Sequence, residues 1–102
     1  MDSLTDLGKE LNEPSLKSVP RVIILIALAI NKKMNFRELQ LVASCGKGSL
    51  SNHLEKMSGD GLISIRSVLR KNGPGISVSI TEKGIEVYKK YKELMLRVLT
   101  ED

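Results

Sequence analysis

The amino-acid sequence predicts an α+β fold that is mainly helical and carries one small antiparallel β-hairpin. Three observations lead to this prediction. Apolar residues recur with helical spacing before residue 58 and again after residue 82. Between these segments the apolar period changes to two, as in strands with one buried face. The length of 102 residues is typical of one domain, whose single core buries about two-thirds of the unfolded chain's surface.

The charge is unevenly distributed along the chain. The whole sequence has a formal net charge of +4, and residues 32–72 alone carry eight basic and three acidic residues. Residues 1–19 are mildly acidic, with two basic and four acidic residues. A basic middle segment indicates a polyanionic partner such as nucleic acid, and a merely solvated lysine-rich surface is the alternative.

Cysteine content and hydropathy narrow the class of protein further. Cys45 is the only cysteine, so an intramolecular disulfide is excluded. The acidic N-terminal segment does not resemble a secretory signal peptide. Residues 22–30 form an unbroken apolar run, which is shorter than the roughly 18 residues that span a bilayer. The run predicts a helix buried on all sides, and we expect a cytoplasmic protein without membrane association.

Two helices are expected before residue 32. A short amphipathic helix in an N-terminal arm of residues 1–14 is predicted by three leucines spaced i, i+3 and i+7: Leu4, Leu7 and Leu11. Pro14 follows this helix. Ser18 is a suitable N-cap for the second helix, and Pro20 suits its first turn. This second helix is expected to end near Asn31.

A helix-turn-helix is predicted next. Asn35 and Glu38 have the spacing of a capping box, and the short helix that follows turns one apolar face inward. Residues 43–46 form a tight break. A third helix is expected from Lys47 to Ser58, with Gly59 and Gly61 at its end. Its apolar stripe has the spacing i, i+4, i+7 and consists of Leu50, Leu54 and Met57.

The remaining segments predict a hairpin and a last helix. Residues 63–66 and 76–80 alternate between apolar and polar, and residues 70–75 between them read as a basic turn. Thr81 and Glu82 open the last helix, which tolerates Gly84 near its start. This order is the layout of a winged helix-turn-helix in one domain of residues 1–102, with a winged-helix core at 18–81 and a C-terminal dimerisation helix at 82–102.

Several segments resemble the winged-helix transcription regulators of the MarR and ArsR type, especially a compact archaeal and bacterial branch. The segments are Phe36-Arg37-Glu38-Leu39, Gly48-Ser49-Leu50-Ser51-Asn52-His53-Leu54, Gly61-Leu62-Ile63 and Ile80-Thr81-Glu82-Lys83-Gly84. The resemblance implies that the third helix enters the DNA major groove and that the hairpin tip touches the backbone or the adjacent minor groove. It also implies a two-fold dimer through the terminal helices. The chain departs from the family at Gly46, where a Ser or Thr cap is common, and in a wing that reads as short and poor in arginine.

The third helix supplies the candidate DNA-reading side chains. Asn52 points away from the apolar stripe, and its amide suits the edge of an adenine. Serine hydroxyls and lysines suit phosphates. The candidate DNA contacts on the third helix are Lys47, Gly48, Ser49, Ser51, Asn52, His53 and Lys56, and those of the wing are Arg66, Arg70 and Lys71. His53 has the alternative of a half-buried packing residue that bonds to a neighbouring backbone group.

The terminal helices supply a candidate dimer interface. Apolar residues of the last helix follow the 3-4-3 spacing of a helix seam. The predicted interface consists of Leu4, Leu7, Leu11, Tyr88, Tyr91, Met95 and Val98. The two tyrosines have the alternative of lining a ligand pocket. For Cys45 we predict a structural thiol in the turn, and a redox switch is the alternative.

These observations predict a homodimeric transcriptional regulator that binds double-stranded DNA in a sequence-specific way. A non-specific architectural DNA-binding protein and a winged-helix protein-interaction module are the alternatives. No catalytic constellation is evident, so we do not expect an enzyme. One histidine and one cysteine cannot complete a zinc site, and no cofactor is expected. The operator, the sign of regulation and any small-molecule effector do not follow from the sequence.

Overall fold

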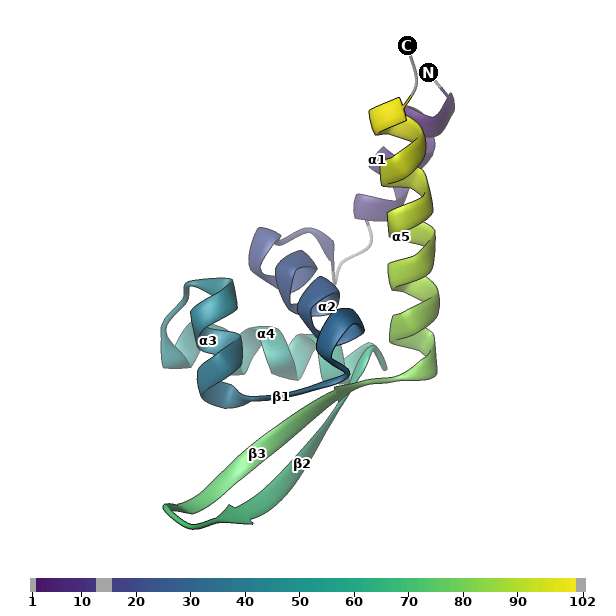
Figure 1. Ribbon diagram of the computed structural model, residues 1–102. Coiled ribbons are helices and arrows are strands. Elements are labelled where there is room, and N and C mark those ends of the chain that lie inside the picture. The colour runs from purple at the N-terminus through teal and green to yellow at the C-terminus, as the bar shows by residue number, and fades with distance from the viewer. Residues whose placement is uncertain (1, 13–15, 101–102) are drawn as a thin grey trace.

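The computed structural model describes residues 2–12 and 16–100. Its elements are α1 (Asp2–Leu11), α2 (Val19–Asn31), β1 (Lys33–Asn35), α3 (Phe36–Ala43), α4 (Lys47–Gly59), β2 (Ile63–Arg70), β3 (Gly73–Ile80) and α5 (Glu82–Thr100) (Figure 1). The predicted fold class, mainly helical with a small antiparallel sheet, is confirmed, as is the order of the predicted elements. Pro14, expected to follow the first helix, lies outside the described residues.

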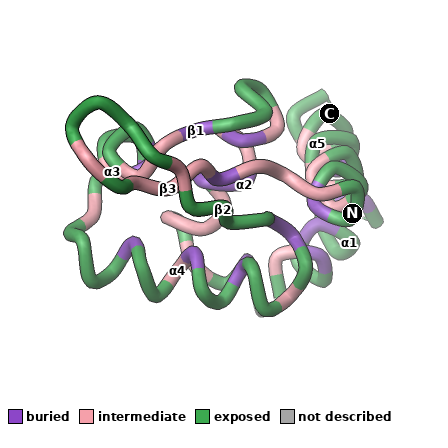
Figure 2. Tube along the Cα trace, turned by 90° about the horizontal axis from the view of Figure 1, so that it is seen from below, coloured by how far each residue is buried: buried purple, intermediate pink, exposed green. Residues whose placement is uncertain are grey.

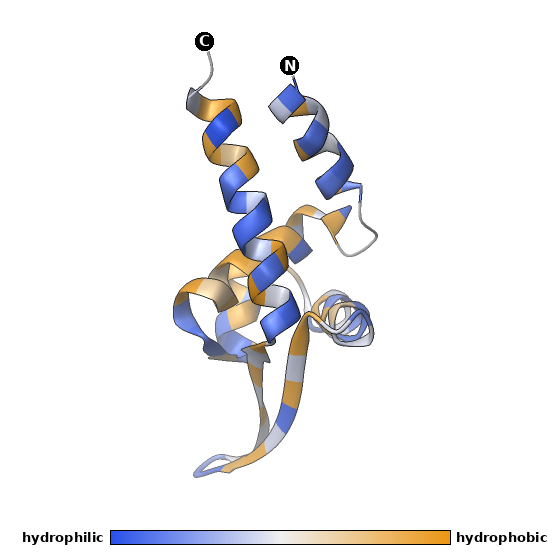
Figure 3. Cartoon of the chain, turned by 90° about the vertical axis from the view of Figure 1, so that its right-hand side faces the viewer, coloured by the Kyte–Doolittle hydropathy of each residue, from blue (hydrophilic) through white to orange (hydrophobic). Residues whose placement is uncertain are grey.

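Two parts project from a central helical core. α1 and α5 run antiparallel along one arm, and the β2–β3 hairpin extends from the opposite side of the core (Figures 1 and 3). The molecule is therefore elongated, with principal extents of 52 × 22 × 22 Å. Among the described residues, no helix is both long and apolar enough to cross a membrane.

Helix α2 lies at the centre of the core, but the prediction that it is buried on all sides is wrong. Ile24, Leu25 and Leu28 are fully buried against the other core helices and the sheet. Val19 is 72% exposed and Ile30 is 67% exposed on another side of the same helix. The apolar run is wider than the face that this small domain can cover, so part of α2 remains uncovered within the chain.

Local capping signals explain where the helices begin. The Asn35 side chain accepts a hydrogen bond from the Glu38 backbone N–H (2.8 Å), and the Glu38 carboxylate accepts from the Asn35 backbone N–H (3.0 Å). The predicted capping box of α3 is thus confirmed. Ser18 is the N-cap of α2 as predicted and Pro20 lies in the first turn, but the Ser18 side chain makes no capping hydrogen bond.

The sheet contains a third strand, β1, that was not predicted from the sequence. Its strand order is β1-β3-β2, and all pairs are antiparallel. β1 has only three residues with a single apolar side chain, which is too short for a period-two pattern to show. Met34 of β1 lies opposite Val78 of β3, and both side chains are buried. This pair anchors the base of the hairpin to the core.

The hairpin is longer than predicted. Arg70 pairs with Gly73, so the turn consists of Lys71 and Asn72 alone rather than residues 70–75. The expectation of a short wing is therefore wrong. The prediction fails because the sequence Gly73-Pro74-Gly75 is typical of a turn, whereas in the structure these residues are part of strand β3. Pro74 is tolerated there because β1 pairs only with residues 77–79 and leaves this part of β3 with a free edge.

Candidate nucleic-acid interface

Helix α4 presents one buried and one open face. Leu50, Leu54 and Met57 are buried in the core, as their spacing predicts. All but one of the candidate DNA contacts on α4 are exposed: Lys47, Gly48, Ser49, Ser51, Asn52 and Lys56. A Cβ added to Gly48 would meet no atom within 4 Å, so this glycine leaves open space beside the start of the helix. The face combines hydroxyls, an amide and ammonium groups, which suit phosphates and base edges.

His53 is the exception on α4. It is half-buried, and its Nδ1 lies 3.2 Å from a guanidinium nitrogen of Arg21 on α2. Burial, together with the charge of Arg21, lowers the pKa of His53 below its usual value of 6.5. The neutral imidazole can accept a hydrogen bond from Arg21, so His53 joins the two helices through a side chain rather than through a backbone group. The His53 side chain, predicted as a DNA contact, is thus directed toward α2 in the structure.

Two polar residues of α3, Arg37 and Gln40, lie beside the turn before α4 and were not among the predicted DNA contacts. Ser44 adopts a left-handed conformation (φ 50°) and ends α3, which allows α4 to start three residues later. A shallow hollow of about 420 Å³ lies at this turn and is lined in part by Arg37 and Gln40. Because these two residues are three apart on α3, helical spacing predicts that they lie on the same side of that helix. Helical spacing does not predict that this side lies next to the start of α4.

Cys45 lies in the same turn. It is half-buried, packs against the core cluster and also lines the hollow. Its packing is compatible with the structural role predicted for it, which remains a prediction.

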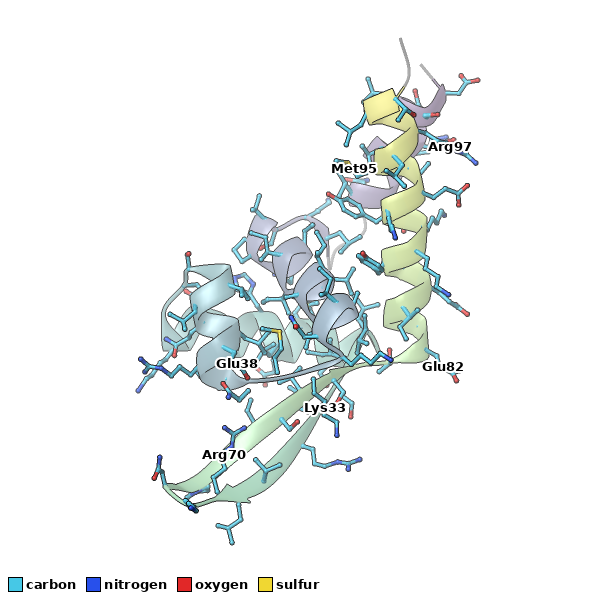
Figure 4. All side chains as sticks on the ribbon, viewed as in Figure 1. Lys33, Glu38, Arg70, Glu82, Met95 and Arg97 are labelled. Carbon is cyan, nitrogen blue, oxygen red and sulfur yellow. The ribbon has the colours of Figure 1, made fainter. Side chains whose placement is uncertain are left out.

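The β2–β3 wing carries its cations on exposed positions. Arg66, Arg70 and Lys71 are all exposed, and Arg66 and Arg70 share one face of β2 because strand side chains alternate. The Arg70 guanidinium donates to the backbone carbonyl of Ile76 (3.2 Å) and lies across Gly75, where an added Cβ would come within 3.2 Å of Nε. Arg70 is thus held along the wing, where Figure 4 labels it.

One residue of the predicted dimer interface, Leu7, is already buried between the terminal helices of the same chain. Leu7 is only 7% exposed, because α1 packs on α5 within the same chain, where Leu94 is also buried. An ion pair between Glu10 and Lys90 (3.2 Å) joins the same two helices. Leu7 is therefore already covered and does not form part of an open apolar face.

The other predicted interface residues keep some surface exposed to solvent. Leu4 is exposed. The half-buried residues of the predicted interface are Leu11, Tyr88, Tyr91, Met95 and Val98. Tyr88 packs partly against the core. Two exposed leucines near the end of α5, Leu96 and Leu99, were not in the prediction. Figure 4 shows Met95 and Arg97 on different sides of α5.

The exposed side chains of α4 and of the wing are mostly groups that donate hydrogen bonds or carry positive charge. Exposed positions of α4 carry hydroxyls, one amide and two ammonium groups beside the Glu55 carboxylate, and the wing adds two guanidinium groups and a lysine. Within residues 2–12 and 16–100, no three histidine, cysteine or acidic side chains come together as a metal site would require. A helix with an open polar face next to a cationic hairpin has the form of a surface that docks on a polyanion.

Comparisons with known proteins identify the family. Residues 21–99 match the family described as winged helix DNA-binding domain. The chain belongs to this family. The match begins within α2 and ends within α5, so it includes the helix-turn-helix, the wing and most of α5. No protein of curated function matches the chain in sequence.

Solved structures of winged-helix regulators superpose over nearly the whole chain. A transcriptional regulator homologue from Pyrococcus horikoshii has a TM-score of 0.74 at 26% identity, covering 97% of this chain and 95% of that one. A MarR-family regulator from Enterococcus faecalis has a TM-score of 0.77 at 19% identity, covering 98% and 88%. A mutant Escherichia coli MarR in complex with operator DNA has a TM-score of 0.68 at 19% identity, covering 96% and 70%. The resemblance to MarR-type winged-helix proteins is thereby confirmed.

Proposed function

We propose that this winged-helix protein is a transcriptional regulator that binds double-stranded DNA in a sequence-specific way as a homodimer. The observation that carries the proposal is the open polar face of α4 next to the cationic wing. A recognition helix of this length fits the major groove, and phosphate contacts from both sides would fix its register. Family membership and the MarR complex with operator DNA support the same partner.

Within this proposal the residues have different tasks. Asn52 is exposed in the second turn of α4, and its amide can donate to and accept from an adenine edge. Ser49 and Ser51 can donate to phosphates, and Lys47 can pair with one. Lys56 lies 3.7 Å from Asp60 in an exposed ion pair that contributes little stability, so it remains available to a phosphate.

Uncovered apolar side chains support the homodimer. Exposed residues gather on α2, at the start of α1 and near the end of α5: Val19, Ile23, Ile30, Leu4, Leu96 and Leu99. Between α1, α2 and α5 lies an open groove of about 570 Å³ whose lining is mostly apolar and includes Ile26 and Tyr91. In a two-fold pair each contact occurs twice, so the projecting arm of one copy can cover the groove of the other while its own groove is covered in return.

Selection of bound sequences from a random duplex pool tests the DNA proposal. A sequence-specific dimer enriches a palindrome whose half-sites are about one helical turn apart. Asn52→Ala should relax the preference at one position in each half-site and weaken specific binding by about 1–3 kcal/mol. An architectural protein would enrich no sequence, and equal weakening on specific and random DNA would remove Asn52 from base reading. A protein-interaction module would show no salt-dependent DNA binding.

Sedimentation tests the dimer separately. Replacing both Tyr91 and Met95 with glutamate places two charges beside the groove and should give a monomer with far weaker DNA binding. Lys92→Glu adds a carboxylate to an exposed position of the same helix and serves as the control. A wild-type monomer at tens of micromolar with full affinity for a palindromic site would overturn the dimer.

A further inference from the structure

Leu69, near the tip of the wing, is the most exposed large apolar side chain in the described part of the molecule. It is 89% exposed, and its partner across the hairpin, Pro74, is exposed as well. Val78 is the last fully buried residue of β3 toward the tip, and Leu69 lies four residues beyond the position that pairs with it, or about 13 Å along the strand. Figure 2 shows the turn end of the hairpin as exposed or half-buried. The fold therefore gains no burial from a leucine at this position.

The tip of the wing is narrow. Lys71 and Asn72 alone form the turn, and Gly73 begins the returning strand without a side chain. A Cβ added to Gly73 would meet no atom within 4 Å, so nothing packs beside it. Neighbouring strands are about 4.8 Å apart, and the minor groove of B-DNA is about 6 Å wide and 7.5 Å deep. The turn end of this hairpin can therefore approach the floor of a minor groove, which is too narrow for a helix.

The charge around this apolar pair is positive only. Residues 63–80 contain three basic residues and no acidic one. Arg70 lies on the opposite face of β2 from Leu69, because strand side chains alternate. Its hydrogen bond to the Ile76 carbonyl (3.2 Å) directs it back along the wing, so it does not cover the tip. The cations therefore flank the apolar pair, in positions that suit the phosphates on either side of a groove.

Size and charge together identify the partner of this pair. A stable protein interface buries about 800 Å² on each partner, which is far more than two side chains supply. One apolar side chain is enough to separate two stacked base pairs, and leucine and proline both serve as such wedges in proteins that bind the minor groove. We propose that Leu69, beside Pro74, inserts between base pairs from the minor groove and bends the duplex. The proposal rests on the proposed function and gives the wing a task that phosphate contacts alone do not perform.

A wedge at the wing tip has a consequence for sequence preference. Separating two base pairs costs free energy that depends on the step, and pyrimidine–purine steps such as TA and CA are the easiest to unstack. Leu69 would therefore select such a step beside each half-site without a hydrogen bond to any base. This preference is separate from the one that Asn52 gives α4, because the two residues lie on different elements.

Fluorescence of 2-aminopurine, which is quenched while the base is stacked, tests the wedge. The probe replaces single adenines in turn along the selected duplex and the base pairs that flank it. We expect the full-length wild type at saturation to raise the fluorescence at one step beside each half-site. Energy transfer between dyes on the two duplex ends should report a bend of at least about 20°. Leu69→Ala should lose both signals but keep the salt slope of log K, because it removes no charge.

Two further variants separate the wedge from a general effect on the wing. Leu69→Met should keep both signals, since methionine also serves as a wedge. Ser67→Ala changes an exposed residue on the same face of β2, two positions closer to the core, and should also keep them. Because Leu69 is exposed, its replacement should leave the unfolding midpoint unchanged. Full signals in Leu69→Ala, or an equal loss in Ser67→Ala, would refute the proposal.

Binding measurements separate this proposal from the proposed function. Changing the unstacked step to one between G·C pairs should weaken the wild type at least about fivefold and affect Leu69→Ala less. If the wild type bound its selected site without a bend or a 2-aminopurine signal, the wedge alone would be refuted. If it bound no duplex, the proposed function would fail and the wedge with it. Loss of the dimer in Leu69→Ala, measured by sedimentation, would assign Leu69 to a protein contact and overturn the wedge.

Discussion

The clearest prediction concerns Gly84 in the first turn of α5. A Cβ built on this residue would lie 2.2 Å from the backbone carbonyl oxygen of Leu62 and 2.7 Å from Cγ1 of Ile80. Ile80 Cγ1 belongs to a side chain that can rotate. The Leu62 carbonyl cannot easily move, because it accepts a hydrogen bond from the Thr81 N–H (3.1 Å) at the point where the sheet meets α5. Close approach of two backbones therefore requires glycine here.

The net effect of Gly84→Ala is a balance of two terms. Alanine in a helix is more favourable than glycine by about 1 kcal/mol. Overpacking a close contact typically costs about 1–3 kcal/mol, and a carbonyl that is already hydrogen-bonded favours the upper part of that range or beyond. We therefore expect a net loss of about 1–2 kcal/mol in the free energy of unfolding. For a domain of this size this lowers Tm by at least about 4 °C.

Urea unfolding followed by circular dichroism measures this effect. Gly8→Ala is the matched control, because Gly8 lies in α1 and an added Cβ meets no atom within 4 Å. That variant should gain about 0.5–1 kcal/mol from helix propensity alone. All variants must be compared at one protein concentration, since dimerisation would make the apparent stability depend on it. A Gly84→Ala protein as stable as Gly8→Ala would refute the argument from close packing.

Three further predictions concern the wing, His53 and Cys45. Replacing both Arg70 and Lys71 with alanine should weaken binding to all sequences and lower the salt slope of log K by about two units, and an unchanged slope would mean that the tip touches no phosphate. The pKa of His53 is lowered in the folded state, so stability should be constant above about pH 6.5 and should fall as the pH decreases from there toward the lowered pKa; His53→Gln should remove this dependence in unfolding measured between pH 5 and 8. Cys45→Ser should destabilise the domain by about 1 kcal/mol, and peroxide should not affect DNA binding by the wild type, whereas thiol-reversible loss would support a redox switch.

Features that depend on neighbouring residues in the chain could be predicted from the sequence. The capping box of Asn35 and Glu38 joins residues three apart, and it marks the start of α3 correctly. The Leu50, Leu54, Met57 stripe identifies the buried face of α4 because helical spacing alone decides it. The exposed face of α4, with its candidate DNA contacts, follows from the same geometry.

Features that depend on distant residues could not be predicted. The hydrogen bond between Arg21 and His53 joins positions 32 residues apart. Helical spacing within α4 therefore places His53 at the edge of the exposed face but cannot show that its side chain contacts α2. β1 exists only because β3 pairs with it. The sequence predicts only that the last helix tolerates Gly84, whereas the contact with Leu62 explains why glycine is needed there. In each case the missing information is which elements pack together.

The junction around Gly84 also connects α4 to the α1–α5 arm that we propose for dimerisation. Lys83 donates to the carbonyl of Asp60 (2.8 Å), and the Thr81 hydroxyl donates to the carbonyl of Gly61 (2.6 Å) while it accepts from the Gly84 N–H (3.0 Å). Asp60 and Gly61 directly follow α4, so the first turn of α5 is bonded to the end of α4. If two copies pair through their arms, the two hydrogen bonds to Asp60 and Gly61 help to fix the distance between the two α4 helices. A change at this junction should therefore alter the preferred half-site spacing before it alters the preferred bases.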